Sequence, residues 1–183
     1  MPPSRTRMLP LRRSLLLAPL AWALPSLSRP APAQSLIPPA LMGQASQLFA
    51  TLIHVGRENA IAAGVRPVPP GLYRALLGFF PDRLLRRARH VTGPMENIGI
   101  PGLAMSYGDI TAMTLGEVIV FRDETRARED AKLWAHELTH VLQYERWGIE
   151  GFAERYLEDS EAVEQEARDN ADRYVRWSRQ ARH

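Results

Sequence analysis

The sequence His136-Glu137-Leu-Thr-His140 places two imidazoles and one carboxylate within five positions. On a helix, residues four apart lie on the same face, so both histidines could bind a single zinc ion. Glu137 follows the first histidine and could reach a water held by the metal, acting as its general base. The pattern therefore predicts zinc-dependent hydrolysis, with His136 and His140 as metal ligands and Glu137 as the catalytic residue.

A catalytic zinc site needs a third protein ligand and an open fourth position. A third histidine in the metzincin spacing is excluded, because Gln143 and Arg146 occupy the positions of the glycine and the final histidine of that pattern. A downstream carboxylate remains. Glu161 and Glu164 are three positions apart and would share one face of the last predicted helix.

We choose Glu164 as the third ligand and keep Glu161 as the alternative. The segment Glu164-Gln-Glu166-Ala resembles the Glu-x-Glu-Ala segment of gluzincin-type peptidases such as the integral-membrane CAAX proteases. In those peptidases the first glutamate binds the metal, which implies a His-His-Glu set here. Glu166 would point elsewhere and bond to water or an arginine. Arg168 stands where those peptidases usually have an aspartate, so the resemblance assigns no second carboxylate behind the ligands.

Two stretches together resemble one known family. Thr114-Leu-Gly-Glu-Val-Ile-Val-Phe121 is similar to its strand motif, and Leu133-Trp-Ala-His-Glu-Leu-Thr-His-Val-Leu-Gln143 is similar to its zinc-helix motif. The family is the core domain of extracellular contractile injection systems (eCIS core). The resemblance implies a metallopeptidase domain in which the two histidines bind zinc and the adjacent glutamate is the catalytic carboxylate. Members commonly occur as modules of larger proteins or as neighbours of injection systems.

The absence of cysteine restricts any zinc site to histidine and carboxylate ligands, which are more often catalytic than structural. The first interpretation is thus a zinc metallopeptidase acting on a protein or peptide. The alternative is a non-catalytic zinc-binding module, in which the metal joins the histidine-bearing helix to the last helix. A helical protein without metal is a third interpretation, which purified protein lacking stoichiometric zinc would favour.

Several further residues could assist the site. Tyr144, Tyr156 and Tyr174 are candidates to stabilise the oxyanion, although aromatic residues at helical spacing more often belong to the core. Asp159 could accept a hydrogen bond from a ligand imidazole or could cap the last helix. Gln143 matches the helix motif of the family and could form a hydrogen bond near the site.

The positions of apolar, proline and glycine residues predict an α+β fold that is predominantly helical, in one zincin-like domain over residues 34–183. Its N-terminal helices lie in residues 38–80 and its metal-site region in residues 109–183. Two β-branched runs around Gly116 predict a small hairpin, and its edge could take up an extended substrate. The expected helices are 40–63, 72–80, 127–147, 150–157 and 159–177, and the expected strands are 109–115 and 117–121. The first helix carries Leu41, Ala45, Leu48, Leu52, Val55 and Ile61 at mainly three- and four-residue steps.

The basic charge of the chain belongs to its first 33 residues. The whole chain carries 23 basic and 20 acidic residues, but residues 1–33 hold five arginines and no acidic residue, which leaves 18 basic against 20 acidic residues and a charge of −2. A basic start, a short apolar run and Ala31-Pro-Ala33 predict a signal peptide over residues 1–33. We therefore expect export to the periplasm or secretion, with cleavage before Gln34, no stable membrane span in the mature chain and no nucleic-acid partner. The sequence does not indicate an oligomeric state.

Overall fold

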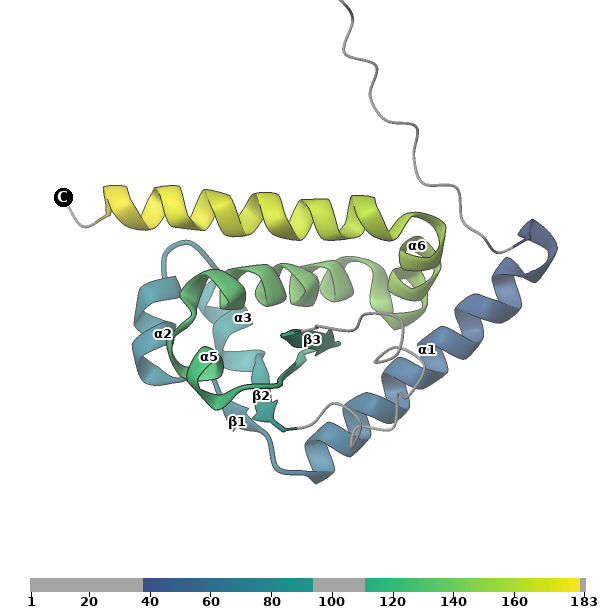
Figure 1. Ribbon diagram of the computed structural model, residues 1–183, viewed down its shortest axis with the longest axis horizontal. Helices are drawn as coiled ribbons and strands as arrows, with labels where there is room; N and C mark the ends of the chain where they lie inside the picture. Colours follow the sequence, from purple (N-terminus) through teal and green to yellow (C-terminus); the bar gives the residue numbers. More distant parts are fainter. Residues whose placement is uncertain (1–37, 94–110, 182–183) are drawn as a thin grey trace, which may run out of the picture. The chain divides into compact units, whose positions relative to one another are not determined.

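The computed structural model describes residues 38–93 and 111–181, so the predicted signal peptide and most of the expected loop over residues 93–108 lie outside them. The predicted fold class is confirmed, because helices dominate and four short strands form one sheet (Figure 1). The helices are α1 (Pro39–Ala62), α2 (Pro70–Leu76), α3 (Asp82–Arg87), α5 (Glu124–Glu129) and α6 (Ala131–Gln180). Within the described ranges, none of them combines the length and the apolar composition that crossing a membrane requires.

The sheet has the strand order β1-β2-β4-β3, with β1 at Arg66–Pro67, β2 at Arg89–Thr92, β3 at Ala112–Leu115 and β4 at Val118–Phe121. The predicted hairpin is β3 and β4, which pair in antiparallel fashion around Gly116, a residue with φ of +67° that favours glycine. Strand β2, which runs parallel to β4, was not predicted from the sequence. All four residues of β4 are buried, as expected for a central strand.

Helix α1 packs through a face other than its row of large apolar residues. Its buried residues are Ala50, Ile53, Gly56 and Ala60. Leu48 is 62% exposed and Val55 is 45% exposed. Small side chains let the α1 backbone approach the rest of the domain closely, so the expected apolar row remains partly at the surface.

The guanidinium of Arg57 fixes α1 against the hairpin turn. Its Nε donates to Glu117 Oε2 at 3.0 Å and its NH2 group donates to the other carboxylate oxygen. Burial would raise the pKa of Glu117, but Arg57 outweighs this effect and the pKa lies below its ordinary value. The long N-terminal helix is therefore held at the end of the strand that faces the candidate site.

Helix α6 consists of three segments, separated by non-helical backbone at Gly148 (φ 72°, ψ 175°) and Asp159 (φ −154°, ψ 78°). These breaks agree with the predicted boundaries near residues 148 and 159. The expected single helix over residues 127–147 is wrong at its start, because α5 ends at Glu129 and Asp130 caps α6 by accepting from the amide of Leu133. Figure 1 shows the last segment of α6 running back alongside the first. This return brings downstream carboxylates beside the histidines.

Candidate metal centre

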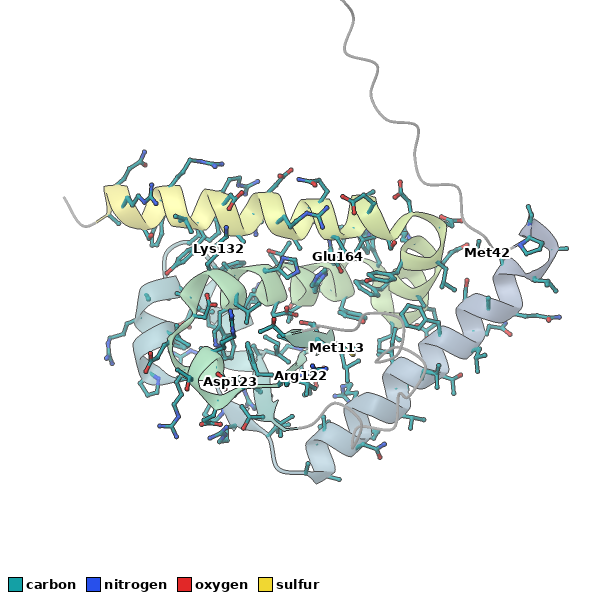
Figure 2. The ribbon with its side chains drawn as sticks, viewed as in Figure 1. Met42, Met113, Arg122, Asp123, Lys132 and Glu164 are labelled. Atoms are coloured by element: carbon teal, nitrogen blue, oxygen red, sulfur yellow. The ribbon has the colours of Figure 1, made fainter. Side chains whose placement is uncertain are left out.

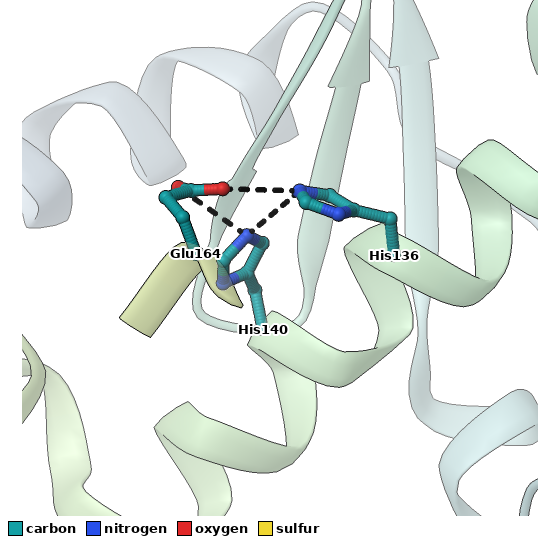
Figure 3. Close-up of side chains that lie close together, drawn as sticks. All are labelled: His136, His140 and Glu164. Atoms are coloured by element: carbon teal, nitrogen blue, oxygen red, sulfur yellow. Dashed lines mark hydrogen bonds and ion pairs between the residues drawn. The ribbon is translucent and has the colours of Figure 1, made fainter. Parts of the chain in front are cut away.

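Three side chains from two segments of α6 converge in the structure (Figure 3). His136 Nε2 lies 3.2 Å from His140 Nε2 and 3.2 Å from Glu164 Oε2, and His140 Nε2 lies 3.6 Å from Glu164 Oε1. Within residues 38–93 and 111–181, these are the residues whose donor atoms converge closely enough to hold a metal ion. The alternative ligand Glu161 is exposed and pairs with Arg168 instead.

The spacing of these donors suits zinc. Donors bound at 2.0–2.2 Å in tetrahedral directions lie about 3.3–3.6 Å from one another, and the three observed separations of 3.2, 3.2 and 3.6 Å lie close to that range. Two imidazoles and one carboxylate are also a usual donor set for zinc that keeps an open coordination position. His136, His140 and Glu164 would therefore hold the ion.

A buried amide fixes the orientation of His140. Gln143 is completely buried, and its Nε2 donates to the carbonyl oxygen of Val163 and to Glu166 Oε2, each at 3.0 Å. Its Oε1 therefore faces His140 Nδ1, at 2.8 Å, and accepts a hydrogen bond from the N–H of that nitrogen. This tautomer leaves the Nε2 lone pair of His140 directed at the other two donors. Glu166, expected to bond to water or an arginine, also pairs with Arg146.

The Glu164 carboxylate and the His140 imidazole shift each other's pKa. Burial would raise the pKa of Glu164, but His136 and His140 outweigh it, so the pKa lies well below its ordinary value. Burial would likewise lower the pKa of His140, but Glu164 and Glu137 raise it above its ordinary value. Because metals bind the deprotonated imidazole, a cation here competes with protons and binds more weakly as the pH falls.

Glu137 is 3% exposed and lines the same cavity as the three converging residues. Thr114 on β3 donates from its Oγ1 to Glu137 Oε2 at 2.7 Å, and Tyr144 donates to the Thr114 carbonyl oxygen at 3.2 Å. Sequence reasoning missed this function of Thr114, although it is the first residue of the strand motif. The strand thus positions the carboxylate that follows the first histidine.

A second buried contact joins the two long segments of α6. Asn170 Nδ2 donates to Thr139 Oγ1 at 2.7 Å, and that hydroxyl donates to the carbonyl oxygen of Ala135 at 2.8 Å. Asn170 was not predicted from the sequence, because a buried asparagine in a polar helix has no distinctive pattern. Together with Gln143, it fixes the separation between the helix with the histidines and the helix with Glu164.

The structure separates the three candidate tyrosines. Tyr156 donates to Glu164 Oε1 at 3.1 Å and lines the cavity. Burial raises the pKa of Tyr144 well above its ordinary value. Tyr174 donates a hydrogen bond to the carbonyl oxygen of Ala75, on another helix. Asp159 accepts from the amide of Ala162 and therefore caps the last segment of α6. Of the tyrosines, Tyr156 is the one placed beside the converging ligands.

The fold and the converging side chains define a predominantly helical α+β domain with a candidate His-His-Glu metal centre. Residues 103–148 match the sequence model of the eCIS core domain, which confirms the predicted resemblance to that family over this segment. The matched segment contains the hairpin and both histidines, whereas Glu164 lies beyond it. No curated protein and no solved structure matches the chain.

Proposed function

We propose that this protein is an exported zinc-dependent peptidase of the His-His-Glu type. The observation that carries the proposal is the position of Glu137, a buried carboxylate that faces the same cavity as His136, His140 and Glu164. A metal site that only stabilised the fold would need no second, buried carboxylate beside the three ligands. Burying such a group is costly, which favours a chemical purpose.

Zinc, when bound, would supply a Lewis acid that polarises the substrate carbonyl and lowers the pKa of water. The residues of the chain would perform the remaining tasks. Thr114 holds Glu137 Oε2, so we assign Oε1 to accept a proton from the attacking water and to return it to the departing amine. Tyr156, beside Glu164, is placed to donate to the developing oxyanion.

The edge of β3 supports a peptide as substrate. Residues Thr111 to Leu115 line the cavity, and among the described residues β3 pairs with β4 on one side only. An extended peptide could add to the other side through backbone hydrogen bonds and would then cross the cavity beside Glu137. A protein or peptide is therefore the class of substrate that we propose.

A second candidate function is a non-catalytic zinc-binding module. The origin of the three donors favours it, because they come from the two segments of α6 that a metal would join. Glu137→Gln separates the two functions. Zinc binding and folding should survive in both cases, but only a peptidase has hydrolysis to lose.

The test begins with elemental analysis of purified protein. Wild type and Glu161→Ala should each hold one zinc per chain, and Glu164→Ala should bind it far more weakly. Hydrolysis of an unfolded protein substrate should then be abolished in Glu137→Gln. Equal zinc contents in Glu164→Ala and wild type would refute the assignment of Glu164 as a ligand. A wild type that holds full zinc but is inactive would exclude the peptidase and favour the non-catalytic zinc-binding module.

A further inference from the structure

The cavity at the candidate metal centre changes character along its length. It has a volume of about 710 Å³, large enough for several residues of a bound peptide. One end of the cavity lies at Lys132, one helical turn before His136. The lining is charged there, and Lys132 Nζ pairs with Asp172 Oδ1 at 2.7 Å. In Figure 2, Lys132 lies farther than Glu164 toward the C-terminal end of α6.

The other end of the cavity is apolar and aromatic. It is lined by five residues that come from three elements: Phe49 and Ile53 of α1, Met113 of β3, and Phe152 and Tyr156 of α6. We call these residues the aromatic wall.

The rings of the aromatic wall contact one another and lead directly to the metal ligands. The Tyr156 ring lies 5.8 Å from Phe49 and 5.6 Å from Phe152, between ring centroids, and Phe152 lies 6.1 Å from the imidazole of His140. The Tyr156 hydroxyl in turn reaches Glu164. An apolar group bound against the wall would therefore sit immediately beside the reacting bond.

The wall is a surface of the cavity as well as part of the core. Phe49, Met113 and Tyr156 are only half-buried, although each packs against a buried hydrophobic cluster. Apolar surface that remains open beside convergent polar groups is typical of a binding pocket, because a ligand gains free energy by covering it.

We infer that the aromatic wall is a specificity subsite that receives a bulky apolar side chain of the substrate, adjacent to the bond that is cleaved. This inference rests on the proposed function and names its preferred substrates: extended segments with Leu, Ile, Met, Phe or a similar residue at one subsite. Phe49, Phe152 and Tyr156 lie outside the matched eCIS core segment. Of the aromatic wall, only Met113 thus lies within the matched segment.

The experiment uses acetylated and amidated hexapeptides Ser-Gly-X-Ser-Gly-Ser in which X is Gly, Asp, Leu or Phe. Cleavage by the zinc-loaded protein should be about 10- to 100-fold more efficient for Leu and Phe than for Gly, from the burial of one large side chain. Phe49→Ala should reduce this preference roughly tenfold, because a large part of the contact is lost. Leu48→Ala is the matched control, since Leu48 is 62% exposed on the same helix.

Binding of the same peptides to zinc-loaded Glu137→Gln, measured by calorimetry, separates the two proposals. Tighter binding of the Leu and Phe peptides that depends on Phe49, together with an inactive wild type, would support the subsite and refute the peptidase. Cleavage that is indifferent to X, or a preference that Phe49→Ala leaves unchanged at normal zinc content, would overturn the subsite and leave the peptidase standing.

Discussion

Gln143 offers a sharp test of how the candidate centre is held together. It is fully buried, and its amide joins His140 to the Val163 carbonyl and to Glu166. Gln143→Met keeps the approximate volume of the side chain and removes all three hydrogen bonds. Nothing would then fix the tautomer of His140, and its ring would lose the contact that directs Nε2 at the metal.

The magnitude follows from the groups left without partners. The Val163 carbonyl and His140 Nδ1 would both be buried without this hydrogen bond, at a cost of about 1–3 kcal/mol each. Glu166 still pairs with Arg146 and should add little. We expect the free energy of unfolding to fall by about 2–6 kcal/mol and the zinc affinity to fall about 10- to 100-fold, as for other residues that orient a metal-bound imidazole.

The assay is competition for zinc against a chromophoric chelator, with urea unfolding of the metal-free protein in parallel. Gln165→Met is the matched control, because Gln165 lies on the exposed side of the last segment and bonds to Asp169. A Gln143→Met protein that binds zinc as tightly as wild type would refute the idea that this amide orients the ligand. Loss of stability alone would make Gln143 a packing residue.

Three further predictions concern other parts of the chain. Thr114→Val should lower kcat/KM for peptide hydrolysis about ten- to hundredfold at unchanged zinc content, because Glu137 loses a charge-assisted hydrogen bond; an unchanged rate would show that β3 does not position it. Burial, aided by Arg66, lowers the pKa of His90 below its ordinary value of 6.5. The unfolded chain thus binds a proton at His90 more readily than the folded chain does. In urea unfolding, the free energy of unfolding of wild type relative to His90→Phe should fall as the pH drops from 7 to 5. A difference that does not depend on pH would contradict this. Finally, N-terminal sequencing of the exported protein should begin at Gln34, and retention of residues 1–33 would refute the predicted cleavage.

Local patterns predicted the parts of the site that neighbouring residues build. His136 and His140 are one helical turn apart, so their convergence needs only a helix, and Gly148 and Asp159 already indicated where the long helical region is interrupted. Glu164 was chosen by resemblance to a known segment, and the structure places it beside both imidazoles. These inferences needed no knowledge of distant contacts.

The sequence could not indicate what distant segments contribute. Phe49 meets Tyr156 across more than one hundred positions, and no periodicity reports such a contact. On α1 the large apolar residues suggested one face, but close approach selected the face with Ala50, Gly56 and Ala60. Strand β2 was missed because Arg89 and His90 follow a basic helical turn, and only pairing with β4 makes this segment a strand.

The two breaks in α6 have a consequence for the order in which the protein assembles. All three converging donors belong to one helical hairpin between Ala131 and Gln180, so they can meet after closure of a single short loop. The aromatic wall, by contrast, needs α1 to dock from far along the chain, which is a slower, non-local event. The hairpin could therefore capture a metal ion before α1 completes the aromatic end of the cavity, so ion binding would need less of the fold than the cavity does.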